Sequence, residues 1–224
     1  MDGNGRWAKA RHRPRVFGHQ QGVKTVRRIV EDAADMGIKY LTLYSFSTEN
    51  WTRPKDEIAA LFQLLKKYVA DDLNTLNRNK VRVRIIGSRD GLSDDLLETI
   101  ARVESTTKNN DEFFLNIAFN YGGRDEIIRA MKRAGAAGHN LQTIDENIVS
   151  QYLDTAGLPE PELIIRTSGE RRVSNFLMWQ TTYSEFVFTD ILWPDFSRKD
   201  LELAISEFQT RERRFGNLKT EDVA

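Results

Sequence analysis

The chain has 224 residues, 40% of them hydrophobic and 29% charged, proportions that predict one soluble globular domain. Lysine plus arginine equals aspartate plus glutamate, 33 each, so the net charge of zero disfavours a nucleic-acid-binding protein. The absence of cysteine excludes disulfides, thiolate nucleophiles and cysteine-based metal sites, and no apolar run reaches the roughly 18 residues of a membrane span.

Apolar periodicity predicts helices and strands in alternation along the chain. In chain order we expect a helix over residues 22–36, a strand over 39–46, a helix over 55–77, a strand over 81–86, a helix over 93–108, a strand over 112–119, a helix from about 124, a helix over 145–153, strands over 162–165 and 184–189, and a helix over 197–213. Strands separated by helices imply a parallel sheet. We therefore predict an α/β fold, a single domain of residues 1–224 with a central, mostly parallel β-sheet flanked by helices.

The segment 1–9, ahead of these elements, is dense in polar chemistry. It contains a carboxylate, Asp2, two glycines and the guanidinium of Arg6. Glycines let a ligand approach backbone N–H groups, arginine grips phosphate oxygens, and a carboxylate holds Mg²⁺. These residues predict a site for a pyrophosphate–metal complex, and the alternative is a polar tail with a turn. Eight cations and no acid between residues 6 and 28 favour the compact phosphate ligand.

Three polar loops follow predicted strands, over residues 45–53, 120–124 and 166–174. In open parallel sheets, ligands bind beyond the carboxyl ends of the strands, so we expect these loops to meet at one site. The loop 166–174 offers cations and hydroxyls for a second diphosphate. The alternative is a charged surface loop whose arginines pair with Glu170 or Glu185.

The loop 45–53 mixes an aromatic residue, Trp51, with polar groups directly after a strand. Trp51 in this position would cover an apolar ligand and exclude water. The alternative is that Trp51 pins the start of the following helix and Asn50 caps it.

The blocks of this sequence resemble those of the cis-prenyltransferases, and most closely the bacterial undecaprenyl diphosphate synthases. They follow the family's order over the whole chain: MDGNGRWA at 1–8, FGH at 17–19, LYSFSTENWTRP at 43–54, NYGGR at 120–124, RTSGE at 166–170, SNFL at 174–177, YSE at 183–185 and RERRFG at 211–216. The resemblance implies an enzyme that condenses isopentenyl diphosphate with an allylic diphosphate, typically farnesyl diphosphate, in successive Z additions. Its product would be a long-chain polyprenyl diphosphate such as undecaprenyl diphosphate, a cell-wall lipid carrier.

The resemblance also implies roles for single residues. At the reacting centre it places Asp2, Ser47, Asn50 and Arg53, and as ligands of the cofactor Mg²⁺ it names Asp2 and Glu185. The allylic diphosphate would be held by Gly3, Asn4, Gly5, Arg6, Trp7, Arg15 and His19. Isopentenyl diphosphate would be held by Arg166, Arg172 and Ser174, and the substrate entrance would be lined by Phe46 and Trp51. The apolar tunnel for the growing product would have as walls the helices 22–36 and 55–77 with Leu43, Ile85, Phe113 and Leu115.

Further implications concern assembly and location. The family resemblance predicts a homodimer in which the arginine-rich segment near Gly216 reaches the partner's site. It also predicts a cytoplasmic enzyme with peripheral contact at the inner membrane face for product release.

The family carries a hydrophobic strand directly before its first block, whereas this chain begins at Met1 of that block. We expect the chain as given to lack this first strand and to be impaired relative to one extended by it. Two alternative functions stay open: a non-catalytic partner subunit of a cis-prenyltransferase, and a cis-prenyltransferase with a shorter or longer product.

Overall fold

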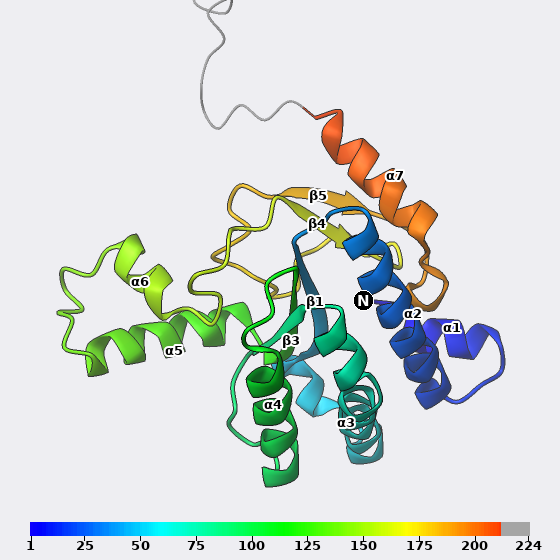
Figure 1. The fold of residues 1–224 in the computed structure, drawn as a ribbon, viewed down its shortest axis with the longest axis horizontal. Helices are drawn as coiled ribbons and strands as arrows, with labels where there is room; N and C mark the ends of the chain where they lie inside the picture. Colours follow the sequence, from blue (N-terminus) through cyan, green and yellow to red (C-terminus); the bar gives the residue numbers. More distant parts are fainter. Residues whose placement is uncertain (212–224) are drawn as a thin grey trace, which may run out of the picture.

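A computed structural model of the chain describes residues 1–211, and its fold alternates helices and strands (Figure 1). The elements are α1 (Asn4–Ala10), α2 (Arg15–Asp35), β1 (Tyr40–Ser47), the 3₁₀ helix η1 (Thr48–Thr52), α3 (Lys55–Arg78), β2 (Val81–Ile86), α4 (Asp94–Thr107), β3 (Phe113–Tyr121), α5 (Gly123–Ala136), α6 (Glu146–Tyr152), β4 (Leu163–Arg166), β5 (Glu185–Phe188), the 3₁₀ helix η2 (Trp193–Asp195) and α7 (Arg198–Gln209). All five predicted strands are confirmed, and β2 has its predicted bounds.

The N-terminal helices differ most from the prediction. Helix α2 begins at Arg15 rather than at residue 22, because Pro14, with φ −58°, supplies a preset backbone angle directly before the helix. Helix α1 was not predicted, since it has only seven residues and follows a glycine-rich turn. The last residues of the predicted helix 197–213, Glu212 and Arg213, lie outside the described residues.

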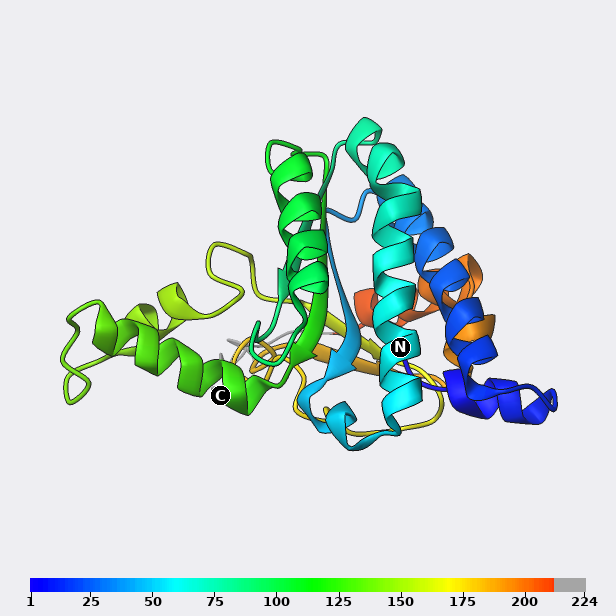
Figure 2. The ribbon, with the colours of Figure 1, turned by 90° about the horizontal axis from the view of Figure 1, so that it is seen from below.

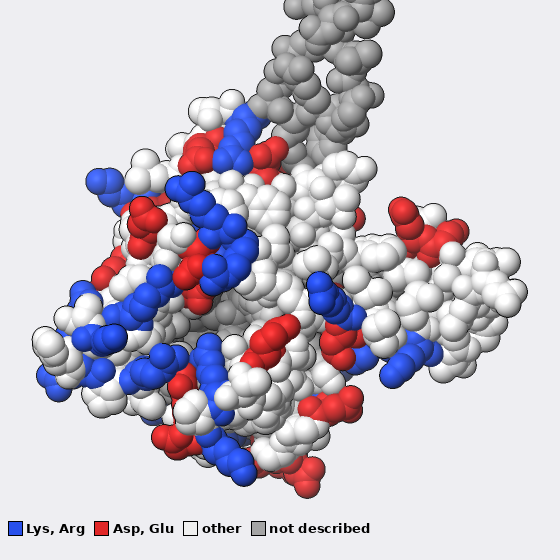
Figure 3. Space-filling model, turned by 180° about the vertical axis from the view of Figure 1, so that it is seen from behind, with Lys and Arg blue, Asp and Glu red and all other residues white. Residues whose placement is uncertain are grey.

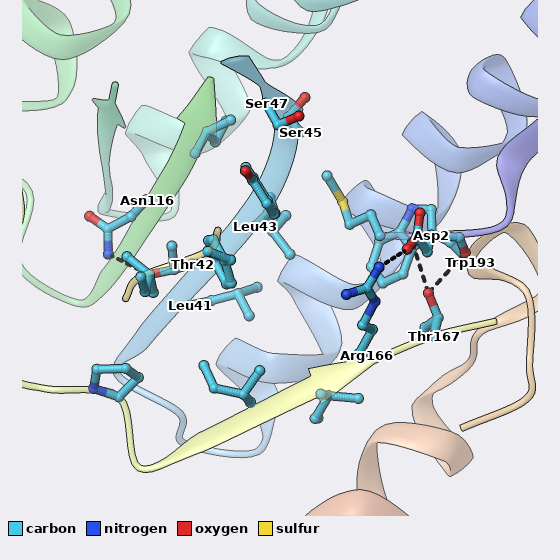
Figure 4. A pocket seen from close by; sticks show the side chains of 18 of the residues that line it. Asp2, Leu41, Thr42, Leu43, Ser45, Ser47, Asn116, Arg166, Thr167 and Trp193 are labelled. Carbon is cyan, nitrogen blue, oxygen red and sulfur yellow. Dashed lines mark hydrogen bonds and ion pairs between the residues drawn. The ribbon is translucent and has the colours of Figure 1, made fainter. Parts of the chain in front are cut away.

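The five strands are parallel, as predicted, but they form two sheets. Strand β3 lies between β1 and β2 in the first sheet, and β4 pairs with β5 in the second. Within residues 1–211 no strand joins the outer edge of β1 to β4, and the two strands instead face each other across a cavity (Figure 4). The predicted central sheet is therefore divided at this point.

The main core lies where the first sheet packs against α2, α3 and α4. It contains alternate side chains of the strands, such as Leu43, Ile85 and Leu115, together with Ile29 of α2 and Val69 of α3. Figure 2 shows α2 and α3 side by side, and it shows α5 and α6 as an arm that projects from the sheets. Among the described helices, none is both long and apolar enough to span a bilayer.

Helix α1 lies directly on α2 because two glycines of α2 face it. A Cβ atom at Gly18 would stand 2.0 Å from the carbonyl oxygen of Asn4, and one at Gly22 would stand 2.3 Å from its Oδ1. The two glycines are one helical turn apart and so share a face. This close approach fixes the position of the polar segment that precedes α1.

Candidate active site

A single large cavity of about 1,440 Å³ opens at the carboxyl ends of β1 and β4. It is larger than the about 300–1,000 Å³ typical of pockets for drug-sized ligands. Fourteen of the seventeen residues assigned to the site from sequence line it: Asp2, Gly3, Asn4, Gly5, Arg6, Arg15, His19, Phe46, Ser47, Asn50, Arg53, Arg166, Arg172 and Ser174. On the face shown in Figure 3, lysine and arginine side chains gather around a hollow, with acidic side chains among them.

Asp2 is fixed at the mouth of this cavity by both its backbone and its side chain. The Thr167 hydroxyl contacts the backbone N and O of Asp2 at 2.9 Å, and the Trp193 N–H donates to the same O at 2.9 Å. The carboxylate Oδ2 accepts a 2.8 Å bond from Nη2 of Arg166 (Figure 4). The other carboxylate oxygen has no hydrogen-bond donor among the described residues, and the side chain is 47% exposed.

One group of cations surrounds the carboxylate of Glu57. Arg15 donates to it through Nε and Nη2, both at 3.1 Å, Arg53 donates through Nη1 at 3.2 Å, and His19 Nε2 lies 3.4 Å away. Burial lowers the pKa of His19 below its ordinary value, although Glu57 acts in the opposite direction. The imidazole is therefore neutral at pH 7. Arg15 remains 60% exposed and so is accessible to a ligand.

A second group of polar side chains follows β4. Arg166 donates through Nη1 to the Arg172 carbonyl and, at 2.8 Å, to Oγ of Ser174. The loop also holds four non-glycine residues at positive φ: Ser168, Ser174, Asn175 and Leu177. Such backbone strain is concentrated at ligand sites, where the surrounding structure maintains it.

An acidic residue joins Arg6 to the second group. Glu170 pairs with Arg6 at 3.2 Å and also with Arg172, and Arg6 donates in addition to the Ser168 carbonyl at 3.0 Å. The alternative interpretation of the loop therefore holds in part, because Arg172 does pair with Glu170. Arg172 nonetheless lines the cavity with its side chain 63% exposed.

The end of β1 forms the third side of the mouth. The register with β3 is irregular between Tyr44 and Ser47, a bulge of the kind found beside active sites. Asn50 accepts the Ser47 N–H at 3.1 Å and completes a capping box on η1. The alternative interpretation expected Asn50 to cap the following helix, but the N-cap of α3 is Pro54 and has no side-chain hydrogen bond. Phe46, only 1% exposed, packs against the ring of Trp51 and lines the cavity.

Three assigned residues do not line the cavity. Trp7 donates its indole N–H to Asp195 at 2.6 Å and stacks on Phe17, and these contacts hold its ring outside the cavity. Trp51 donates to Asn120 at 2.8 Å and stays 40% exposed, which places its ring behind Phe46.

Glu185 is not brought to Asp2 within the chain. The register of β4 with β5 sets Glu185 opposite Leu163 and Phe188 opposite Arg166. At about 3.3 Å per residue, the three intervening steps separate Glu185 from the Asp2–Arg166 pair by roughly 10 Å along the strand. Glu185 pairs instead with Arg211 at 2.8 Å. The segment near Gly216 lies outside the described residues.

Away from the charged mouth, the cavity has apolar walls on the side of α2 and α3 and polar groups such as Thr42 and Asn116 on the side of the first sheet. Its walls include Val23, Val26 and Ile29 of α2 and Leu61, Leu64, Leu65 and Tyr68 of α3, as expected for these two helices. Leu43 also lines it, whereas Ile85, Phe113 and Leu115 point into the core below β3 and do not. An elongated apolar ligand with a charged head would match this division.

Some contacts at the site were not anticipated from sequence. Thr167 holds the Asp2 backbone, and Glu57 gathers three of the assigned residues. In the sequence, Glu57 differs in no way from Asp56 beside it, since both follow Pro54 in the first turn of a predicted helix. Only the packing of α2 against α3 distinguishes them.

The donors at the mouth suit Mg²⁺ bound through one carboxylate. Among residues 1–211 no three His, Asp or Glu side chains converge on one point. Mg²⁺ is nevertheless commonly held by one or two carboxylates together with substrate phosphates and water. The free oxygen of Asp2, facing the cavity between the two groups of cations, has the chemistry of such a ligand.

The chain matches known proteins over its whole length. Residues 1–216 match the family model described as "Putative undecaprenyl diphosphate synthase". The isoprenyl transferase of Rhizobium meliloti is 52% identical over 228 residues, which cover 100% of this chain and 92% of that protein.

Two solved structures are similar in fold. Lavandulyl diphosphate synthase from Lavandula x intermedia, in complex with dimethylallyl diphosphate, superposes with a TM-score of 0.92 and is 33% identical, covering 97% of this chain and 95% of that one. A probable undecaprenyl diphosphate synthase from Campylobacter jejuni gives a TM-score of 0.80 at 40% identity, covering 88% of this chain and 93% of its own.

Proposed function

Because the chain belongs to the undecaprenyl diphosphate synthase family and is an isoprenyl transferase, we propose that it joins isopentenyl diphosphate to an allylic diphosphate. The primer is farnesyl diphosphate, the new double bonds are Z, and repeated additions give a long-chain polyprenyl diphosphate such as undecaprenyl diphosphate. One observation carries the proposal. Two groups of cations lie on either side of Asp2 at the mouth of one large cavity that has apolar walls along α2 and α3.

The two groups of cations hold the two diphosphates. The allylic diphosphate lies against the segment from Gly3 to Arg6, with Arg15 and His19 beside it, and its hydrocarbon tail enters the apolar cavity. Isopentenyl diphosphate lies against Arg166, Arg172 and Ser174. Arginine side chains can bind both diphosphates through two parallel hydrogen bonds each. Ion pairs of Arg15 with Glu57, Arg6 with Glu170 and Arg166 with Asp2 hold these guanidiniums in position before a ligand binds.

The reaction breaks the C1–O bond of the allylic diphosphate and forms a C–C bond from C1 to the double bond of isopentenyl diphosphate. Loss of one proton then leaves the new Z double bond. Arg6, Arg15 and Arg53 stabilise the charge that grows on the departing diphosphate, since preset cations in a water-poor site are effective in this role. Asn50 and Arg53 order the reacting centre, and Ser47, whose N–H donates to Asn50, belongs to the route of the lost proton.

Mg²⁺ would be held by Asp2 and by the diphosphate oxygens, and it supplies Lewis-acid neutralisation of the leaving group. Arg166 keeps the carboxylate of Asp2 oriented through its 2.8 Å bond. Glu185 joins this site only if another chain supplies it, because its own strand register keeps it away from Asp2.

We further propose a homodimer with the segment near Gly216 at the partner's site, and action in the cytoplasm at the inner face of the membrane. A product with a long apolar chain favours release into a bilayer. The dimethylallyl diphosphate in the lavandulyl diphosphate synthase complex supports an allylic diphosphate as the ligand of this site, and it also favours testing short products.

The test is incorporation of radiolabelled isopentenyl diphosphate with farnesyl diphosphate, with and without Mg²⁺, followed by chromatography of the product. Asp2→Ala is the test variant, and Arg27→Ala, which loses an arginine that pairs with Asp72 away from the cavity, is the control. We expect Mg²⁺-dependent polymer from the parent and the control and none from Asp2→Ala. Equal polymer from all three would refute the role of Asp2, and none from the parent would refute catalysis by the chain as given.

A further inference from the structure

The carboxylate of Glu57 is buried, with its side chain 9% exposed, and it is surrounded by the guanidiniums of Arg15 and Arg53 and the imidazole of His19. Four contacts reach its two oxygens: two from Arg15, one from Arg53 and one from His19. A buried carboxylate is costly unless it is paired, and this one is paired on both oxygens. The surrounding structure is therefore built around this charge.

Glu57 connects three elements, α2, η1 and α3, through polar contacts at one point. Arg15 is the first residue of α2, His19 lies one turn further along it, and Arg53 ends η1. Glu57 itself lies in the first turn of α3, where the helix dipole favours a negative charge. Its three partners line the cavity, whereas Glu57 does not. Glu57 can therefore affect a ligand only through them.

The geometry of Arg15 shows how such an effect arises. Glu57 accepts from Nε and Nη2, which occupy one edge of the guanidinium. The remaining nitrogen, Nη1, faces Gly5, since a Cβ at Gly5 would lie 3.0 Å from it. The ion pair thus directs the free edge of Arg15 toward the glycine-rich segment that lines the mouth. Arg53 likewise uses only Nη1 on Glu57.

Local charge is consistent with this arrangement. Burial by itself raises the pKa of Glu57, but the bonds and charges of Arg15, Arg53 and His19 outweigh it and hold the pKa below its ordinary value. The carboxylate is therefore ionised at neutral pH. With His19 neutral, two guanidiniums face one carboxylate, and one positive charge remains for an anionic ligand.

We propose that Glu57 is a positioning residue that holds Arg15, His19 and Arg53 in place for the allylic diphosphate. The inference rests on the proposed function and adds a residue to it. Isopentenyl diphosphate is expected to be insensitive to Glu57, because Arg166, Arg172 and Ser174 make no contact with this ion-pair cluster.

The test compares Glu57→Gln, which keeps the shape and removes the charge, with Asp56→Asn as matched control. Asp56 is the adjacent acid in the same helical turn, and it is exposed. Glu57→Asp, which keeps the charge, is the conservative variant. For Glu57→Gln we expect kcat to fall by at least tenfold and KM for farnesyl diphosphate to rise severalfold, with KM for isopentenyl diphosphate changed less than twofold. Glu57→Asp should recover part of the loss, and Asp56→Asn should match the parent.

Two measurements do not depend on turnover and separate this inference from the proposed function. The pKa of His19, followed by NMR, should be lower in Glu57→Gln than in the parent, because Glu57 acts to raise it. Binding of inorganic pyrophosphate, measured by calorimetry, should weaken in Glu57→Gln and not in Asp56→Asn. Unchanged His19 titration and pyrophosphate binding, or equal losses for both substrates that follow a fall in Tm, would overturn the positioning role.

Discussion

The docking of α1 on α2 gives the sharpest test of how the fold positions the site. Gly18→Ala adds a Cβ 2.0 Å from the Asn4 carbonyl oxygen and 2.8 Å from its carbon, where ordinary contacts begin near 3.4 Å. Both atoms are backbone, so α1 must move by more than 1 Å. Overpacking of this kind costs about 1–3 kcal/mol, offset by about 0.5–1 kcal/mol from replacing glycine inside a helix.

The expected net loss for Gly18→Ala is about 1–2 kcal/mol, or roughly 2–8 °C in Tm for a chain of this size. Because α1 follows Asp2 and Gly3 directly, a displacement near 1 Å should also lower kcat/KM by about 10–100-fold. The control is Gly135→Ala in α5, where the nearest atom, in Leu141, is 3.5 Å away. This substitution should leave activity unchanged and raise Tm slightly. If thermal unfolding and turnover respond alike to both substitutions, the close approach of α1 to α2 does not position the site.

Three further outcomes are expected. Burial and the charge of Asp154 raise the pKa of Glu126 above its ordinary value, although the hydrogen bonds from Tyr121 and Gln180 act in the opposite direction. A carboxyl group whose pKa is raised by folding stabilises the protein at low pH, and this stability is lost as the pH rises from the unfolded-state pKa through the folded-state pKa. In urea unfolding between pH 4 and 8, the free energy of unfolding attributable to Glu126 should therefore fall with rising pH in the parent and not in Glu126→Gln. The same pH dependence of the unfolding free energy in both proteins would contradict this. The side-chain amide of Asn175 donates a hydrogen bond to Glu49 at 2.7 Å. Asn175→Asp should therefore raise KM for isopentenyl diphosphate about tenfold, and adding Glu49→Gln should restore the parent value. If the double variant does not recover, loss of this hydrogen bond is not the cause. An apolar segment of about 5–6 residues added before Met1 should pair with the facing edges of β1 and β4 and raise both Tm and activity; equal values for the two chains would rule this out.

Local patterns in the sequence were sufficient for most of the fold. Apolar alternation and helical spacing predicted all five strands, and the order of helices and strands predicted their parallel arrangement. Because loops that follow parallel strands meet at one edge, the same patterns brought together the loops 45–53 and 166–174, whereas the third predicted loop, 120–124, does not line the cavity. Local signals failed at α1, where seven residues after a glycine turn carry too little periodicity to be recognised.

The tertiary structure alone decided which side chains pair. Glu57 and Asp56 have the same local sequence, and only the crossing of α2 over α3 buries one and leaves the other exposed. The register of β4 with β5 separates Glu185 from Asp2, and Asp195 draws Trp7 away from the cavity. Local sequence predicts helices and strands because neighbouring residues belong to the same element. Contacts between residues about 40 to 190 positions apart depend instead on how whole elements pack against one another.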